Sequence, residues 1–257
     1  ISTMGSNLFI VLSGSFTAAG VRSGSAGGPT LNVADGEAMA ELEGVVNVAP
    51  TNQGRRQLAY GAQNWNANVV GTTPEYLAAR AWTIASGAAF GDSDVRSATR
   101  VALVGKTTAQ NLFGDEDPVG KTMRIQQNPF VVIGVLGSKG QNLDGNDQDD
   151  TVIIPLTTAQ RKVFGTPFLG SVRMIMVQAE SGDAMQRTMD SVESLLRQRH
   201  RLREGAPNDF FTRNLSAAAE SEAETTRTMS ILLGAIASIS LLVGGIGIMN
   251  IMLVSVT

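Results

Sequence analysis

The 257-residue chain contains no cysteine and only one histidine, His200. The lack of cysteine excludes thiol nucleophiles, disulfide bonds and zinc–thiolate sites, and a single histidine excludes a clustered histidine metal site. Charge of one sign is also scarce, because 20 basic and 23 acidic residues give a net charge of −3. Without a basic surface field the chain lacks the main attraction for nucleic acid, so we expect no nucleic-acid partner.

A complete nucleotide-binding phosphate loop is missing. Two GKT tripeptides, at 105–107 and 120–122, resemble the end of such a loop. The loop requires a further glycine five residues before the glycine of GKT, but those positions hold Arg100 and Asp115. We therefore expect no ATP site of this type in the chain.

A complete calcium loop is missing as well. Asp144, Asn146 and Gln148 have the spacing of calcium ligands, but Asp149 stands where the loop needs glycine and Pro155 where it needs a bidentate glutamate. The sequence therefore predicts no calcium site.

His200 is the one side chain that could act as a general base near neutral pH. It lies in a run of arginines at the predicted end of a helix, so we expect a solvated side chain, and no G-x-S-x-G nucleophile motif accompanies it. The sequence predicts no catalytic residue, no cofactor-binding residue and no metal ligand in this chain.

Residues 231–256 contain no charged side chain. A helix of that length spans roughly 39 Å, more than the hydrocarbon core of a bilayer. A core helix of a soluble protein would show a polar stripe, which is absent here. We predict that residues 231–257 form the start of a transmembrane helix, preceded by a polar connecting segment, 216–230. Because the chain opens at Ile1 and stops within this apolar run, we expect both ends to lie inside a longer protein.

Small residues follow one seam of the predicted membrane helix, namely Ala237, Ser240, Gly244 and Gly247. Helices associate in lipid through close packing at small side chains, so this seam predicts a helix–helix contact. The alternative is that glycine is simply frequent in transmembrane helices.

The first part of the soluble region predicts strands around a helix. Leu8–Leu12 is an apolar run typical of a buried strand. We expect Asp35 to cap a helix that ends near Gly44, followed by a strand at 45–48. Alternating apolar and polar residues at 58–60 and 65–69 predict a hairpin.

A strand–turn–helix pattern occurs twice further on, where VALV leads into TTAQNLFG and VII leads into TTAQRKVFG. Thr107 or Thr108, and Thr157 or Thr158, are the expected helix caps. Residues 121–126 and 130–136 predict a second hairpin.

The remaining soluble segments include a polar loop, 138–150, that lacks apolar anchors, so we expect it to be mobile. A strand at 172–177 follows, and then a helix from Asp183 with an apolar stripe and a basic end. Phe210 and Phe211 begin a last short strand.

Both ends of the chain resemble the borders of the periplasmic domain in MacB-like permeases of the FtsX superfamily: MGSNLFIVLSG at 4–14 and SLLVGGIGIMNIMLVSVT at 240–257. Between them, blocks similar to the same family follow in order: NVVGTTPEYLAAR, RVALVGKTTAQNLFG, DPVGKTMRI, FVVIGVLGSKG and DDTVIIPLTTAQRKVFG. The resemblance implies a mixed α/β (α+β) fold.

The resemblance also implies a division of the chain. A discontinuous porter-like subdomain of β-α-β units would comprise 8–71 and 170–215, and a small mixed α/β subdomain, 72–169, would be inserted in it. The connecting segment and the transmembrane helix would follow.

In function, the resemblance implies a homodimer in the bacterial inner membrane, with residues 1–230 in the periplasm. Such a domain transmits motion driven by ATP and Mg at an ABC ATPase domain elsewhere, so the chain itself has no cofactor. It would dock a periplasmic adaptor protein that leads to a TolC-like outer-membrane channel, at residues that the sequence does not identify.

Two alternatives share this topology. One is an FtsX-like regulatory module that acts on cell-wall hydrolases, against which the length of the domain and the GGIGIMN helix argue. The other is a lipoprotein-releasing permease.

The small-residue seam gives a first prediction. Gly244→Leu places a bulky side chain where a second helix would approach, so it should weaken dimerisation of the full-length protein in membranes, measured by cross-linking or energy transfer. Leu242→Met, two residues away and on the opposite side of the helix, is the control. Unchanged dimerisation in Gly244→Leu would contradict the seam.

Overall fold

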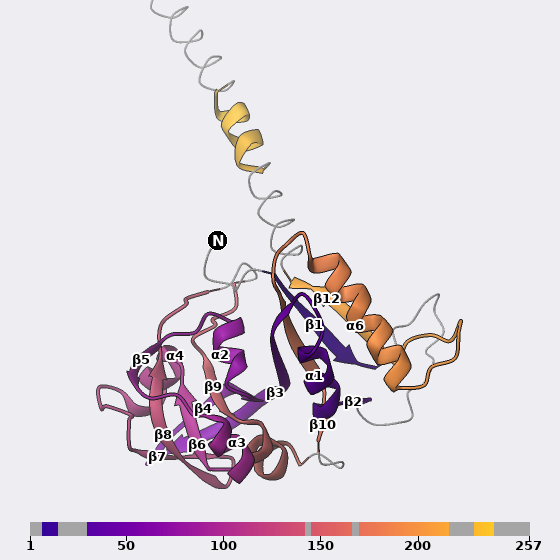
Figure 1. Ribbon diagram of the computed structural model, residues 1–257. Helices are drawn as coiled ribbons and strands as arrows, with labels where there is room; N and C mark the ends of the chain where they lie inside the picture. The colour runs from indigo at the N-terminus through magenta and orange to yellow at the C-terminus, as the bar shows by residue number, and fades with distance from the viewer. Residues whose placement is uncertain (1–6, 15–29, 142–144, 166–169, 216–228, 239–257) are drawn as a thin grey trace, which may run out of the picture. The chain divides into compact units, whose positions relative to one another are not determined.

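The computed structural model describes residues 7–14, 30–141, 145–165, 170–215 and 229–238. Residues 1–215 form one compact unit and residues 216–257 a second. Figure 1 shows the first unit as a sheet with helices packed on it.

The elements of the first half are β1 (Leu8–Ser13), β2 (Leu31–Asn32), α1 (Val33–Ala40), β3 (Val45–Tyr60), β4 (Gln63–Thr72), α2 (Glu75–Ala79), β5 (Ile84–Gly87), α3 (Asp92–Ser97), β6 (Val101–Val104) and α4 (Lys106–Phe113). Those of the second half are β7 (Thr122–Ile125), β8 (Asn128–Leu136), β9 (Thr151–Pro155), α5 (Leu156–Thr158), the π-helical turn η1 (Ala159–Phe164), β10 (Ser171–Val172), β11 (Met174–Ala179), α6 (Met185–Arg199) and β12 (Phe210–Asn214).

Within the described residues, ten strands form one mixed sheet in the order β12-β1-β11-β3-β4-β9-β6-β8-β5, with β7 paired to β3 and β8. The pairs β4–β9 and β6–β8 are parallel and the other pairs are antiparallel. Strands β2 and β10 pair separately. The predicted mixed α/β fold is confirmed.

Strand β1 is apolar from Leu8 to Leu12, and side chains on both of its faces are buried. Phe9 and Val11 pack into a cluster with α1 and α6, whereas Leu8 and Ile10 pack into a cluster with α2 on the opposite face. A strand covered on both faces needs a continuous apolar run and not an alternating pattern. The predicted buried strand at residues 8–12 is therefore confirmed.

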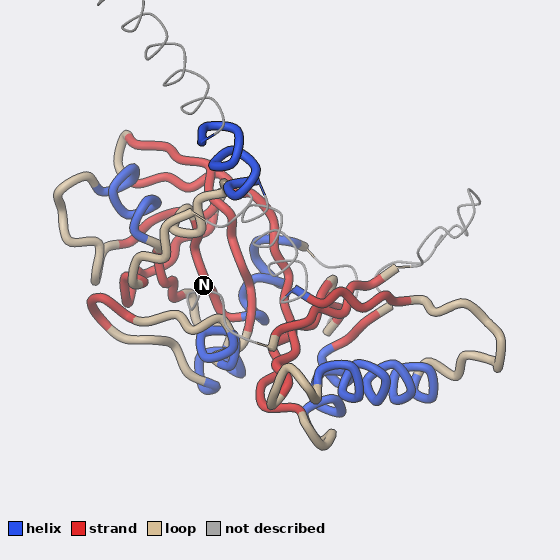
Figure 2. The backbone as a smooth tube through the Cα atoms, turned by 90° about the horizontal axis from the view of Figure 1, so that it is seen from above, coloured by secondary structure: helices blue, strands red, loops and turns tan. Residues whose placement is uncertain are grey.

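Helix α6 carries the predicted apolar stripe. Its side chains Met185, Val192 and Leu196 are buried against the sheet. Seen from above in Figure 2, this long blue helix runs beside one end of the red sheet. At the other end, α4 and η1 cover the same face through Leu112 and Val163.

Strand β3 corrects the prediction of two separate strands at 45–48 and 58–60. One strand runs from Val45 to Tyr60 and changes partner along its length. Its first half, to Thr51, pairs with β11, and its second half, from Asn52, pairs with β4. The polar stretch between the two apolar segments concealed this continuity.

The predicted division into 8–71 with 170–215 and an inserted 72–169 stays a prediction. Two apolar clusters lie side by side on one face of the sheet, one under α1 and α6 and one under α4 and η1. The cluster on the other face contains both Ile10 and Ile153, one from each predicted part.

Helix α1 begins differently from the prediction. The residue at its N-cap is Asn32, whose side chain accepts a hydrogen bond from the Asp35 amide, while the Asp35 carboxylate accepts one from the Asn32 amide. Asp35 therefore closes a capping box from inside the first turn. Its carboxylate also belongs to the charged cluster with Arg199 and His200 that is described below.

The prediction that threonines cap the two repeated helices is wrong. Helix α4 has Gly105 at its N-cap, and α5 has Pro155. The Thr108 hydroxyl donates to Asp150, and the Thr158 hydroxyl donates to the Thr99 carbonyl. Both threonines are buried, and their hydroxyls bond to these distant segments and not to the first turn of their own helix.

The predicted transmembrane segment is described only in part. Residues 229–238 are helical, and the apolar side chains among them, such as Ile231 and Leu233, are exposed. In the part of the chain that the structure describes, no helix is both long and apolar enough to cross a bilayer. Residues 239–257 lie outside the described residues, so the membrane helix stays a prediction.

The packing of η1 on β4 gives a second prediction. A methyl group added at Gly71 would overlap the Cβ of Ala159. Gly71→Ala should therefore lower the free energy of unfolding by about 1–3 kcal/mol, the usual cost of overpacking. The measurement is urea unfolding of the chain in detergent, followed by tryptophan fluorescence, since both tryptophans lie in the first unit.

The control is the double variant Gly71→Ala with Ala159→Gly. It removes the overlap, so it should recover much of the lost stability, less about 1 kcal/mol for glycine in a helical segment. If the double variant is no more stable than the single one, close packing at this position is not the cause.

Candidate functional site

The chain enters and leaves its first unit through two paired strands. Strands β1 and β12 are antiparallel, with Phe9 opposite Asn214 and Ser13 opposite Phe210. Residues far apart in the sequence, 9 and 214, therefore lie side by side, as Figure 1 shows for β1 and β12. Among the described residues, β12 is an edge strand whose only partner is β1.

A half-buried charged cluster lies beside the start of β12, and we call its four residues, Asp35, Arg199, His200 and Asp209, the clamp. The Nδ1 atom of His200 lies 2.9 Å from an Asp209 carboxylate oxygen, and its Nε2 lies 3.2 Å from one of Asp35. The Nε of Arg199 donates to the other Asp35 oxygen at 2.8 Å. The side chains of His200 and Asp35 are 9% and 1% exposed.

The expectation of a solvated His200 is therefore wrong. The residue ends α6 within reach of two carboxylates that are distant in sequence, a contact that the neighbouring arginines did not reveal. Both ring nitrogens are occupied by carboxylate oxygens, so neither is available as a general base toward a substrate.

The clamp is tied to the ends of β1 and β12 through backbone bonds. The Asp209 carbonyl accepts from the Gly14 amide at 3.0 Å and from the Thr30 hydroxyl at 2.7 Å. The Thr30 amide in turn donates to the Ser13 hydroxyl. Residue 209 thus contacts Gly14 after β1, Thr30 before β2 and His200 at the end of α6.

A second buried polar cluster lies where β3 changes partner. The Asn52 side chain accepts from the Arg173 amide at 2.9 Å and donates to the Ser171 carbonyl at 3.3 Å. The hydroxyls of Thr51 and Thr72 lie 3.1 Å apart, and each also reaches a backbone carbonyl. A satisfied buried network of this kind rigidifies the segments it joins.

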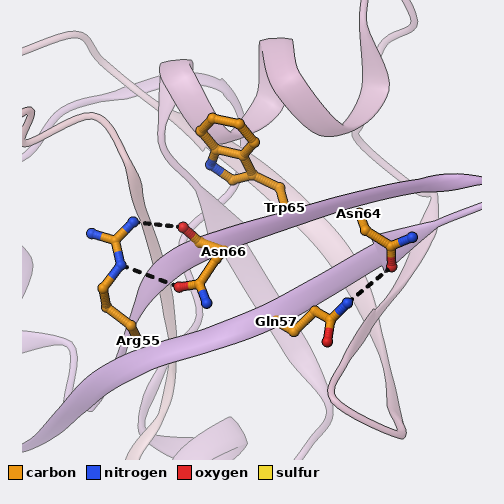
Figure 3. A pocket seen from close by; sticks show the side chains of 5 residues that line it. All are labelled: Arg55, Gln57, Asn64, Trp65 and Asn66. Atoms are coloured by element: carbon orange, nitrogen blue, oxygen red, sulfur yellow. Dashed lines mark hydrogen bonds between the residues drawn. The ribbon is translucent and has the colours of Figure 1, made fainter.

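An open groove lies on the β3–β4 hairpin, drawn in Figure 3. Arg55 donates to the side-chain and backbone oxygens of Asn66, and Gln57 donates to Asn64. These cross-strand pairs hold the register of the hairpin. The polar groups of the groove therefore bond mainly to one another and form no catalytic arrangement.

Trp65 borders the same groove, and its indole is fixed from behind. The indole nitrogen donates to Asp150 at 2.7 Å, and Arg55 donates to the other oxygen of that carboxylate at 3.1 Å. Thr108 adds a third bond to Asp150. Trp65 thus packs on the core of this end of the sheet.

The loop at 138–150, expected to be mobile because it lacks apolar anchors, is held at its described ends by hydrogen bonds. Asp149 accepts from the Ser138 hydroxyl at 2.5 Å and from the amides of Lys139 and Gly140 at 2.7 and 3.1 Å. Asp147 accepts from Thr107. Acidic side chains thus anchor the loop in place of apolar ones.

Lys139 lies over the Trp82 ring, 4.7 Å from its centre. Burial is the largest influence on this amine, followed by the nearby Arg80, and together they lower the pKa of Lys139 to about 8 although Asp149 raises it. Trp82 therefore serves as packing surface for a cation, in agreement with a structural role.

The GKT tripeptides have structural explanations. A side chain at Gly105 would overlap the Asp149 carbonyl, so only glycine permits this approach. Gly120 has a φ of 82° and closes a turn.

Of the predicted calcium-loop residues, Asp144 lies outside the described residues, and among those described no group of acidic and histidine side chains could hold a metal ion.

Of the four predicted helix-packing residues, the structure describes one. Ala237 is in the helical stretch 229–238 and is exposed. Ser240, Gly244 and Gly247 lie outside the described residues, so the contact along this seam stays a prediction.

A family model described as the MacB-like periplasmic core domain matches residues 1–195. The chain belongs to the MacB-like periplasmic core domain family. Members of this family are periplasmic domains and not catalytic ones. Membership therefore confirms the resemblance to MacB-like permeases and the prediction of a non-enzymatic domain. The clamp residues Arg199, His200 and Asp209 lie beyond the matched range.

Curated relatives extend the similarity over the whole chain. The macrolide export ATP-binding/permease protein MacB of Rhodospirillum rubrum is 41% identical and that of Marinobacter nauticus 40%, each across 100% of this chain. The chain spans 38% of the length of these two relatives.

Solved structures share the MacB-like fold. The periplasmic region of MacB from Actinobacillus actinomycetemcomitans has a TM-score of 0.67 and 22% identity, covering 88% of this chain and 95% of that one. The extracellular domain of the noncanonic ABC-type transporter YknZ from Gram-positive bacteria has a TM-score of 0.64 and 21% identity, with 81% and 100% covered. At these identities the likeness concerns the fold alone.

The bonds to Asp150 in this MacB-like domain give a third prediction. Asp150→Ala leaves the Trp65 indole and the Thr108 hydroxyl without their acceptor, so the free energy of unfolding should fall by about 1–3 kcal/mol. Urea unfolding followed by tryptophan fluorescence measures the change. Glu180→Ala, which removes an exposed carboxylate, should stay within about 0.5 kcal/mol of the parent. Equal stability of both variants would contradict the anchoring role.

Proposed function

We propose that the chain is the extracytoplasmic domain of an ABC-type efflux permease, which transmits ATP-driven motion to the periplasm and docks an adaptor protein of a tripartite export system. Membership of the MacB-like periplasmic core domain family supports the setting. The observation that carries the proposal is the pairing of β1 with β12, because a domain held at both ends by neighbouring strands is suited to insertion between two membrane helices.

The sheet offers a continuous path for motion within the first unit. Hydrogen bonds join β12 to β1, β11, β3 and β4 in turn. The buried hydrogen bonds of Asn52 and Thr72 stabilise the point at which the pairing of β3 changes from β11 to β4. A displacement at β1 and β12 would therefore move the sheet as a stiff body and not deform it locally.

In this proposal the protein is a homodimer in the bacterial inner membrane, with residues 1–230 in the periplasm and 231–257 at the start of the second transmembrane helix. ATP and Mg bind at an ABC ATPase domain outside this chain. The relatives named ATP-binding/permease proteins are much longer than the matched region, which leaves room for such a domain.

The adaptor and the TolC-like channel are the finer part of the proposal. The fold alone does not imply them, because the YknZ domain that shares it comes from Gram-positive bacteria. Cross-linking and purification of the full-length protein from its own cells test this point. An adaptor with an outer-membrane channel supports export, whereas a cell-wall hydrolase or a lipoprotein chaperone in their place would favour the regulatory or lipoprotein-releasing alternative.

Motion of the domain gives a fourth prediction. The chain is cysteine-free, so single cysteines at the exposed positions Val46 and Val131 accept spin labels selectively within it. In the full-length homodimer, with cysteines outside the chain replaced, the distance between the two copies of each label should shift when ATP binds. Double electron–electron resonance measures these distances between the spin labels.

The control is the same labelled protein with an ATPase region that cannot bind nucleotide, in which the distances should stay constant. A distance distribution at both positions that does not respond to ATP would contradict transmission of motion to this domain.

A further inference from the structure

The geometry of the clamp fits a protonated histidine. A carboxylate can only accept hydrogen bonds, and both nitrogens of His200 face carboxylate oxygens, at 2.9 Å for Asp209 and 3.2 Å for Asp35. Neutral imidazole has one N–H group and can serve one of them. Only imidazolium has the two donors that this arrangement requires.

We infer that the clamp is a proton-operated switch, which fastens the side chain of Asp209, the residue before β12, to His200 at the end of α6 and through it to Asp35 of α1 when His200 is charged, and which releases that side chain when His200 is neutral.

The charged groups that face His200 come from three segments. Helix α1 contributes Asp35, the residue before β12 contributes Asp209, and α6 contributes Arg199, which is bonded to Asp35. The Phe210 ring meets the imidazole edge-on, 6.0 Å between centres. With His200 protonated these groups carry no net charge, and with His200 neutral they carry an excess negative charge.

The two carboxylates differ in what they can do when the proton leaves. Asp35 is 1% exposed and keeps two other donors, the Arg199 Nε and the Asn32 amide. Asp209 is 32% exposed, and among the described residues His200 is the only partner of its carboxylate. Loss of the proton therefore opens the Asp209 side of the clamp, because that carboxylate can turn to water.

The direction of the titration agrees with this geometry. Burial of the imidazole, the largest influence, lowers the pKa of His200, but hydrogen bonds and charge attraction from Asp209 and Asp35 together raise it above its ordinary 6.5. A pKa that is higher in the folded state stabilises folding fully below about pH 6.5. That stabilisation is lost as the pH rises through the folded pKa.

Release of the Asp209 carboxylate leaves the start of β12 held by the bonds of the Asp209 carbonyl to Gly14 and Thr30 and by the buried Phe210 ring. Strand β12 pairs only with β1 among the described residues, and its start at Phe210 follows Asp209 directly. The switch would thus set how firmly the start of β12 is held at neutral to alkaline pH. It concerns the folded unit itself and does not depend on the proposed export function.

Hydrogen–deuterium exchange of the full-length protein in nanodiscs tests the inference. After correction for intrinsic rates, peptides covering 209–214 should exchange about tenfold faster at pH 8.5 than at pH 6, the effect of losing one charge-assisted hydrogen bond. His200→Gln should exchange at the faster rate at both pH values. Peptides from β9 should not change.

Two further variants keep the test decisive. Asp209→Asn removes the charge at the part-exposed position, and its exchange at 209–214 should likewise lose the pH dependence, even if His200→Gln fails to fold. Arg201→Gln removes an exposed charge beside the clamp and leaves its four side chains in place, so it should behave as the parent. A parent protein without the pH step, or a step that persists in Asp209→Asn, would overturn the inference, whatever the outcome of export assays.

Discussion

The antiparallel pairing of β1 with β12 is the constraint to which the other features of the first unit relate. It places the two points where the chain enters and leaves the unit next to each other, with Phe9 opposite Asn214. Strand β1 is also packed on both sides, since its alternate side chains Leu8 to Val11 fill the apolar clusters on the two faces of the sheet. The edge strand β12, whose described partner is β1, is thus attached to a strand whose side chains are part of the apolar core on both faces.

Burial explains which parts of this fold the sequence could predict. The apolar run at 8–12 and the stripe of Met185, Val192 and Leu196 on α6 were identified because burial imposes a pattern on neighbouring residues. The order of strands in the sheet leaves no such local trace. Nor does the change of partner at Thr51, which depends on segments far along the chain.

The polar residues were harder to interpret for the same reason. Asp35, His200 and Asp209 occur in polar sequence surroundings, and only the fold brings them together. Thr108 and Asp149 were assigned local or solvent-facing roles, whereas their partners lie on other segments. The absence of enzymatic chemistry was predictable, because it follows from residue types that are missing and from the spacing of motifs that are incomplete.

In the proposed function, β12 is the segment through which movement outside the unit would reach the sheet. The most direct measurement inserts a flexible Gly-Ser segment between Leu215 and Ser216 of the full-length protein and compares the ATP-driven displacement of the domain with the rate of ATP hydrolysis. The account predicts that hydrolysis continues while the displacement is lost. A displacement as large as that of the parent protein would contradict it.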